Sequence, residues 1–258
     1  MAPDQLVPYK QLDEYALKLH LFRPQGWAPT DRRPGIVFFF GGGWKKGTTK
    51  QFLIQADYFA SRGIVTARPN YRLAPDGVTP DKCVEDARSA VRWLRANAAR
   101  FGIDPKKVIS AGGSAGGHLA YCTSIKRGAD DRNDDPTISC IPQAMVLYNP
   151  ALFYSDSEGV MVSVGGGTLS AERLKLISPL DHVDKDTPPT LILFGTRDRL
   201  KSGADVYLRL AKEVGIRAEM FTAEGENHGF FNTEPWLSKT TAVVQKLLVS
   251  LGYLDEIK

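Results

Sequence analysis

The segment spanning residues 107–122 constrains the fold more than any other part of the chain. Residues 107–111 form a short, mainly apolar run that predicts a strand, and residues 118–122 can form a helix. Between them, Gly112–Gly117 contains the pattern G-x-S-x-G around Ser114. A serine on such a sharp strand-to-helix turn has a strained backbone, which exposes its hydroxyl above the sheet. The segment therefore predicts a nucleophile turn; a turn of small residues with a surface serine is the alternative.

Strand-like and helix-like segments alternate along most of the sequence, which predicts an α/β fold with a mostly parallel central sheet and helices on both faces. A parallel strand buried on both faces is continuously apolar, as residues 35–40 are. The expected strands are 15–22 (antiparallel and half-exposed), 35–40, 63–68, 107–111, 144–148, 190–194 and 217–222. The expected helices are 81–100, 203–214 and 234–251.

The chain is expected to form a single domain over residues 1–258. Its 258 residues, 43% of them hydrophobic, are enough to bury a sizeable core. No internal repeat, low-complexity tract or linker interrupts the sequence. Residues 150–180 lack a regular pattern and include a glycine run at 165–167. We expect this segment to form a small lid or a cleft wall.

Composition argues against several classes of function. The net charge is only +4 and the basic residues are scattered, so nucleic-acid binding has no support. No apolar stretch has the length of a membrane span, and no signal peptide is visible at the N-terminus. We therefore expect a cytoplasmic protein that does not bind membranes, or a secreted one if a signal peptide has been removed. Cys83, Cys122 and Cys140 are widely spaced and predict reduced packing residues rather than a disulfide or zinc site.

A second glycine run directly follows the expected strand that ends at Phe40. The transition state of acyl transfer carries negative charge on the former carbonyl oxygen, which backbone N–H groups can stabilise. Glycines at 41–43 would let the main chain approach that oxygen without side chains in the way. We expect an oxyanion hole formed by the N–H groups of Gly42, Gly43 and Ala115, the residue after the serine. A flexible loop is the alternative.

An aspartate and a histidine follow later strands in the order that serine hydrolases of this architecture use. Asp198 lies just past the expected strand 190–194, at the end where α/β sheets place functional groups. It could accept the N–H of an imidazole and fix its tautomer. His228 follows the last expected strand and completes the order Ser…Asp…His. The competing carboxylates are Asp181, Asp184, Asp186 and Glu226, and the other histidines are His20, His118 and His182.

Taken together, these motifs resemble those of the α/β-hydrolase superfamily, and more narrowly those of the hormone-sensitive-lipase-like carboxylesterases. The matching segments are 41–44, 71–75, 113–117, Asp198 and His228. The resemblance implies an α/β-hydrolase fold with little or no cap domain, because residues 1–34 are too few for the helical N-terminal cap of the lipase-like members. The chain is most similar in style to compact feruloyl and acetyl-xylan esterases. That similarity implies an open cleft and short acyl groups, such as acetyl esters of carbohydrates.

Two positions depart from the family pattern. Phe40 stands where the family usually has the histidine of His-Gly-Gly-Gly, and Gly113 stands where many relatives have an acidic residue before the serine. Since the family's histidine braces the loop and performs no chemistry, we expect altered loop support with activity retained.

The predicted reaction is ester hydrolysis through an acyl-enzyme, with Ser114 as nucleophile, His228 as general base and acid, and Asp198 as its support. It requires no metal and no organic cofactor. The expected partner is a small-molecule or carbohydrate ester, and Trp44 and Tyr71 either line the alcohol side of the cleft or belong to the core. The alternatives are a thioesterase, an aryl-formamidase or a peptidase with the same triad, and a non-catalytic binding protein of the same fold.

Overall fold

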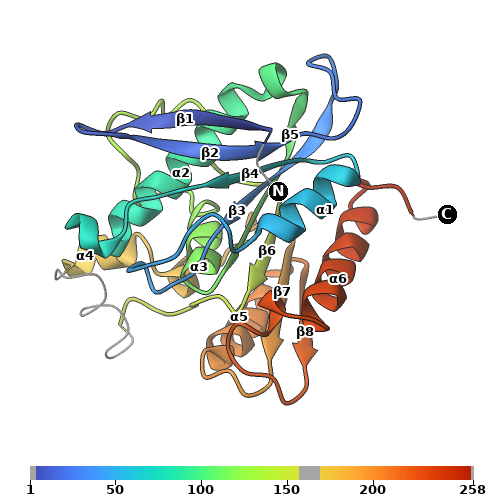
Figure 1. Cartoon of the computed structure of the whole chain (residues 1–258). Coiled ribbons are helices and arrows are strands. Elements are labelled where there is room, and N and C mark those ends of the chain that lie inside the picture. Colours follow the sequence, from blue (N-terminus) through green and yellow to red (C-terminus); the bar gives the residue numbers. More distant parts are fainter. Residues whose placement is uncertain (1–3, 157–168, 257–258) are drawn as a thin grey trace.

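The computed structural model describes residues 4–156 and 169–256, which form an eight-stranded sheet with helices on both faces (Figure 1). The strands are β1 (Gln5–Gln11), β2 (Ala16–Phe22), β3 (Arg33–Phe39), β4 (Val65–Pro69), β5 (Ile103–Gly113), β6 (Ala144–Tyr148), β7 (Thr190–Gly195) and β8 (Ala218–Ala223). Their order across the sheet is β1-β2-β4-β3-β5-β6-β7-β8. The contacts of β2 with β1 and β4 are antiparallel and all others are parallel. The predicted fold class is thus confirmed.

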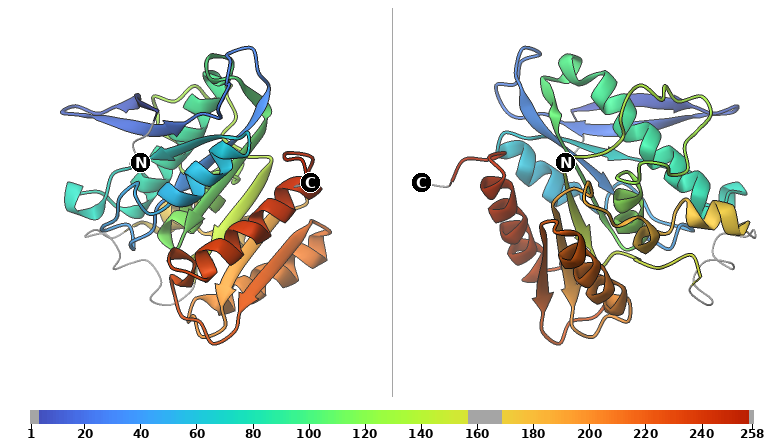
Figure 2. Two further views of the ribbon diagram at one scale, coloured as in Figure 1. Left: turned by 45° about the vertical axis from the view of Figure 1, so that its right-hand side comes forward. Right: turned by 180° about the vertical axis from the view of Figure 1, so that it is seen from behind.

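Hydrophobic residues fill both faces of the sheet. The helices are α1 (Leu53–Ser61), α2 (Pro80–Ala96), α3 (Ala115–Cys122), α4 (Ala171–Lys175), α5 (Lys201–Val214) and α6 (Trp236–Ser250). Helices α2, α3 and α5 cover one face of the sheet, and α1 and α6 cover the other (Figure 2). Because successive strand residues point to opposite faces, Val37 and Phe39 belong to the core of the first face, and Ile36 and Phe38 to the core of the second. This two-sided burial explains why the central strands are continuously apolar.

The antiparallel edge of the sheet has a different pattern. In β2, Leu17, Leu19 and Leu21 are buried while Lys18 is exposed, which is the alternation expected of a half-exposed strand. The edge strand β1 was not predicted from the sequence. It contains Pro8, where the pairing register with β2 shifts, and proline is tolerated in a strand at such an edge.

The ends of the expected helices differ from the observed ones by up to four residues. The helix expected over 81–100 ends at Ala96, and a 3-10 turn over Ala98–Phe101 follows it. Gly102 then adopts a φ of 61°, which ends the turn as expected. Helix α1 was not expected, because no side chain caps its start at Phe52 and its apolar residues do not lie on a single face.

The segment 150–180 is described in part. The short helix α4 lies within it, and a 3-10 turn over Pro179–His182 begins at its end. Residues 157–168, which include the glycine run, lie outside the described residues. The predicted lid therefore stays a prediction. Among the helices described, none combines the length and the apolar character needed to cross a membrane.

Candidate active site

Ser114 occupies the sharp turn between β5 and α3. Its φ of 55° and ψ of −118° are unusual for a residue other than glycine, and its N–H donates to the Tyr148 carbonyl at 2.8 Å. The turn is possible because Gly116 has no side chain: a Cβ there would lie 2.1 Å from the Phe39 carbonyl oxygen. Such local strain is a common feature of residues held for function.

The three loops that follow β5, β7 and β8 bring Ser114, Asp198 and His228 together. The Ser114 Oγ lies 2.8 Å from His228 Nε2, and His228 Nδ1 lies 2.7 Å from Asp198 Oδ2. The Asp198 side chain is 2% exposed and that of His228 is 43% exposed. A buried carboxylate therefore backs an imidazole that stays open to solvent. The competing acid Glu226 accepts instead from the Trp236 indole, at 2.7 Å.

Asn149 is a member of this constellation that the sequence analysis missed. Its Nδ2 donates to Asp198 Oδ2 at 2.9 Å, which is the same oxygen that faces His228. Its Oδ1 accepts the N–H of Gly229 at 3.2 Å. The residue is fully buried and has a φ of 44°. One sequence signal could have revealed it, since Asn149 directly follows a buried strand, at the end of the sheet where functional side chains gather.

The glycine loop after β3 lies against the same turn. Gly42 and Gly43 adopt φ values of 123° and 65°, which glycine tolerates best. Within the described part of the chain, neither of their N–H groups donates to another atom. The N–H of Ala115 has no acceptor within α3, because Ala115 is the first residue of that helix. These three N–H groups can serve an incoming negatively charged oxygen.

The loop is braced without the family's usual histidine. Phe40, at the histidine's position, stacks on Tyr71 with ring centroids 4.2 Å apart. The Tyr71 hydroxyl donates to the Phe40 carbonyl at 2.6 Å, and burial raises the pKa of this hydroxyl, which keeps it a donor. The N–H of Ala74 donates to the Trp44 carbonyl at 2.8 Å. The expected change in loop support thus takes the form of contacts from the 71–75 motif.

Trp44 and His118 connect this loop to the helix behind the serine. The Trp44 indole donates to His118 Nδ1 at 3.3 Å, and His118 Nε2 lies 2.7 Å from the Ile177 carbonyl. Since the indole only donates and the carbonyl only accepts, His118 is neutral with its proton on Nε2. Burial lowers its pKa to about 4. Trp44 and Tyr71 are 7% and 3% exposed, so the structure favours loop support over substrate contact for both.

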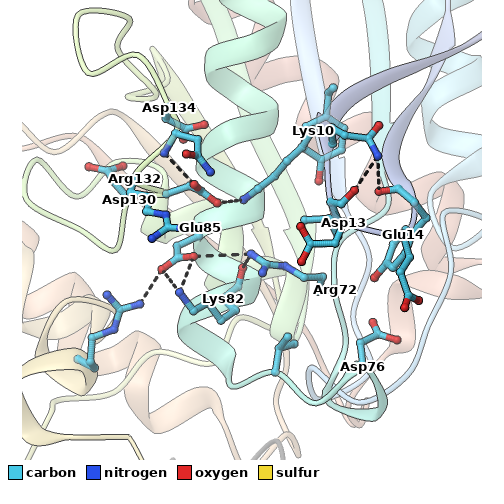
Figure 3. Close-up of a pocket in the computed structure, with 18 residues that line it drawn as sticks. Lys10, Asp13, Glu14, Arg72, Asp76, Lys82, Glu85, Asp130, Arg132 and Asp134 are labelled. Carbon is cyan, nitrogen blue, oxygen red and sulfur yellow. Dashed lines mark hydrogen bonds and ion pairs between the residues drawn. The ribbon is translucent and has the colours of Figure 1, made fainter.

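A separate cavity of about 1160 Å³ lies beside the β1–β2 hairpin and α2 (Figure 3). None of the candidate catalytic residues lines it. Several residues that line this cavity form ion pairs, including Lys10–Asp131 at 2.6 Å and Arg173–Glu85 at 2.7 Å. Because the buried charged side chains at this cavity are paired with one another, they have a structural role and do not form a second reactive centre. Among the described residues, no group of three or more His, Cys, Asp or Glu is placed to hold a metal ion.

Comparisons with known proteins agree with this architecture. The model of the BD-FAE family matches residues 19–204. Esterase 2 of Thermogutta terrifontis, in its apo form, is 37% identical, with a TM-score of 0.91 over 98% of this chain and 96% of that one.

Curated relatives are more distant in sequence. The carboxylesterase NlhH of Mycobacterium tuberculosis is 26% identical over 89% of this chain and 75% of its own. A probable isoprenylcysteine alpha-carbonyl methylesterase of Oryza sativa, ICMEL1, is 27% identical over 78% of this chain and 53% of its own. The chain thus spans about half the length of the methylesterase relatives that it matches. The family match and the close structural similarity together show that the chain belongs to the BD-FAE family, among the hormone-sensitive-lipase-like carboxylesterases of the α/β-hydrolase superfamily.

Proposed function

We propose that the protein is a serine carboxylic-ester hydrolase that acts on short-chain acyl esters through an acyl-enzyme. The observation that carries the proposal is the continuous line of contacts from Ser114 Oγ to His228 at 2.8 Å and from His228 to Asp198 at 2.7 Å. A nucleophile, a base and an orienting acid within hydrogen-bonding distance are what this chemistry requires.

In the proposed acylation, the Ser114 oxygen attacks the ester carbonyl carbon while His228 Nε2 takes the hydroxyl proton. A carboxylate can only accept hydrogen bonds, so Asp198 holds the other imidazole proton on Nδ1 and leaves the lone pair of Nε2 facing Ser114. The carbonyl oxygen becomes negative and receives hydrogen bonds from the glycine loop and the start of α3. His228 then gives its proton to the alcohol oxygen as the C–O bond breaks, which leaves the acyl group on Ser114.

Deacylation repeats these steps with water as the nucleophile. His228 removes a proton from water as the water oxygen attacks the acyl carbon, and then returns that proton to the Ser114 oxygen as the acid leaves. Water can reach the base because the His228 side chain is 43% exposed.

The preference for short acyl groups rests on the resemblance to compact esterases and on the structural neighbours. Two solved structures of Thermogutta terrifontis esterase 2, each 37% identical to this chain, are described as propionate-bound and butyrate-bound. We extend this preference to the present chain and propose acetyl esters, including those of carbohydrates, as the first substrates to examine.

The test is hydrolysis of p-nitrophenyl esters from acetyl to decanoyl by the parent protein and by Ser114→Ala. We expect activity to be highest on acetyl to butyryl esters and to vanish in the variant, after which acetylated sugars would be compared with the acetyl ester. Absence of hydrolysis of every ester by the folded parent protein would overturn the proposal, and so would full activity of Ser114→Ala. A preference for decanoyl esters would overturn the short-chain assignment alone.

A further inference from the structure

Two side-chain amides join the glycine loop to the loop that carries the histidine. The Gly41 N–H donates to Gln51 Oε1 at 2.6 Å, and Gln51 Nε2 donates to Asn232 Oδ1 at 3.1 Å. Asn232 Nδ2 in turn donates to the Gly229 carbonyl at 2.8 Å. We call Gln51 and Asn232 the amide bridge. The bridge spans 181 positions of sequence, so it connects loops that the chain itself does not hold together.

The direction of every hydrogen bond in the amide bridge is fixed by its two ends. The backbone N–H of Gly41 can only donate, so Gln51 must present its oxygen there. The backbone carbonyl of Gly229 can only accept, so Asn232 must present its nitrogen there. The remaining Gln51 nitrogen and Asn232 oxygen then face each other as donor and acceptor. Each link therefore supports the next, as in other chains of hydrogen bonds.

Both ends of the amide bridge adjoin groups used in the proposed reaction. Gly41 directly precedes Gly42, whose N–H belongs to the proposed oxyanion hole, and Gly229 directly follows His228. The peptide of Gly229 is held on its other side as well, because its N–H donates to Asn149. A shift of about 1 Å between reacting groups can lower a rate by about a hundredfold. The amide bridge thus connects the loop of the oxyanion donors to the loop of His228, and the proposed reaction requires a constant distance between these groups.

We infer that Gln51 and Asn232 are positioning residues that set the distance between the oxyanion donors and His228. This inference rests on the proposed function. Neither side chain is deeply buried, since Gln51 is half-buried and Asn232 is exposed. Their replacement is therefore expected to leave the fold intact, and water can substitute for part of each lost hydrogen bond.

The first arm of the test is a kinetic double-mutant cycle with Gln51→Ala, Asn232→Ala and the double variant, using p-nitrophenyl acetate. Either replacement breaks the same bridge, so each single variant should lower kcat by about 3- to 10-fold with little change in KM. The double variant should match the single variants rather than show the product of their effects. Lys50→Ala and Thr233→Ala, at exposed neighbouring positions, serve as matched controls and should retain the parent kcat. A parent-like Gln51→Ala, or fully multiplicative effects, would overturn the inference.

The second arm measures hydrogen exchange of the Gly41 amide by NMR and needs no catalytic activity. The bridge predicts faster exchange in Gln51→Ala and also in Asn232→Ala, although Asn232 does not contact Gly41. Faster exchange in Gln51→Ala alone would show that Asn232 supports only its own turn, and would overturn the inference. If the parent protein hydrolyses no ester, the proposed function fails, whereas the exchange experiment still decides whether the bridge exists.

Discussion

Replacement of Asn149 by alanine tests how strongly its hydrogen bond to Asp198 supports the proposed reaction. The change removes one hydrogen bond at 2.9 Å to the buried Asp198 carboxylate and one at 3.2 Å from the Gly229 N–H. A hydrogen bond to a charged group contributes about 1.5–3 kcal/mol, which corresponds to a rate factor of about 10 to 150 if it is fully expressed in the transition state. Asp198 keeps the Leu200 N–H at 2.9 Å and its contact with His228, so we expect the lower half of that range.

The assay is kcat/KM on p-nitrophenyl butyrate, with Asn149→Gly and Asp198→Asn measured beside Asn149→Ala. Asn149 has a φ of 44°, which glycine adopts without strain and alanine does not. The glycine and alanine variants should therefore lose kcat/KM to the same extent, while the alanine variant should have the lower melting temperature. Asp198→Asn should be the least active of the three, since loss of the acid at such a site costs about 10⁴-fold. Parent-like activity of Asn149→Ala would refute the reasoning, and recovery in Asn149→Gly alone would assign the effect to the backbone.

Three further predictions concern the supports of the site. Tyr71→Phe keeps the ring stacking but removes the hydroxyl that donates to Phe40, so steady-state kinetics should give a kcat about 3- to 10-fold lower. The pKa of His118 is lowered from 6.5 to about 4, so only the unfolded chain gains this proton as the pH falls through that range, and stability should drop by up to about 1.4 kcal/mol per pH unit. The free energy of unfolding, measured with denaturant at several pH values, should depend less steeply on pH in His118→Gln than in the parent protein. An unchanged dependence on pH would contradict the assignment. Gly116→Ala would place a Cβ 2.1 Å from a backbone oxygen, so thermal melting should show a large loss of stability or no folded protein.

The sequence was most informative where one local pattern determines one structure. The buried strand 144–148 and the helix 203–214 lie within two residues of their predicted bounds, because their apolar spacing is strong and uninterrupted. The turn at Ser114 was equally predictable, since its glycines are required by close backbone contacts.

The parts that escaped prediction depend on contacts between distant residues. β1 becomes a strand by pairing with β2 at the edge of the sheet, despite Pro8 and its polar composition. Asn149 is held by its hydrogen bond to Asp198, which lies 49 positions later, and its place directly after a buried strand does not by itself distinguish it from an ordinary loop residue. Trp44 and Tyr71 belong to familiar motifs, but only the packing reveals that their polar atoms bind the protein's own loop and helix.

The most direct test of the central claim is to locate the nucleophile after inactivation with paraoxon. A 37%-identical structural neighbour is described as phosphorylated by this compound. Peptide mass spectrometry should find one diethylphosphoryl group on Ser114, with esterase activity lost in proportion to labelling and no adduct in Ser114→Ala. Full labelling at another residue, or full activity in the labelled protein, would contradict the account.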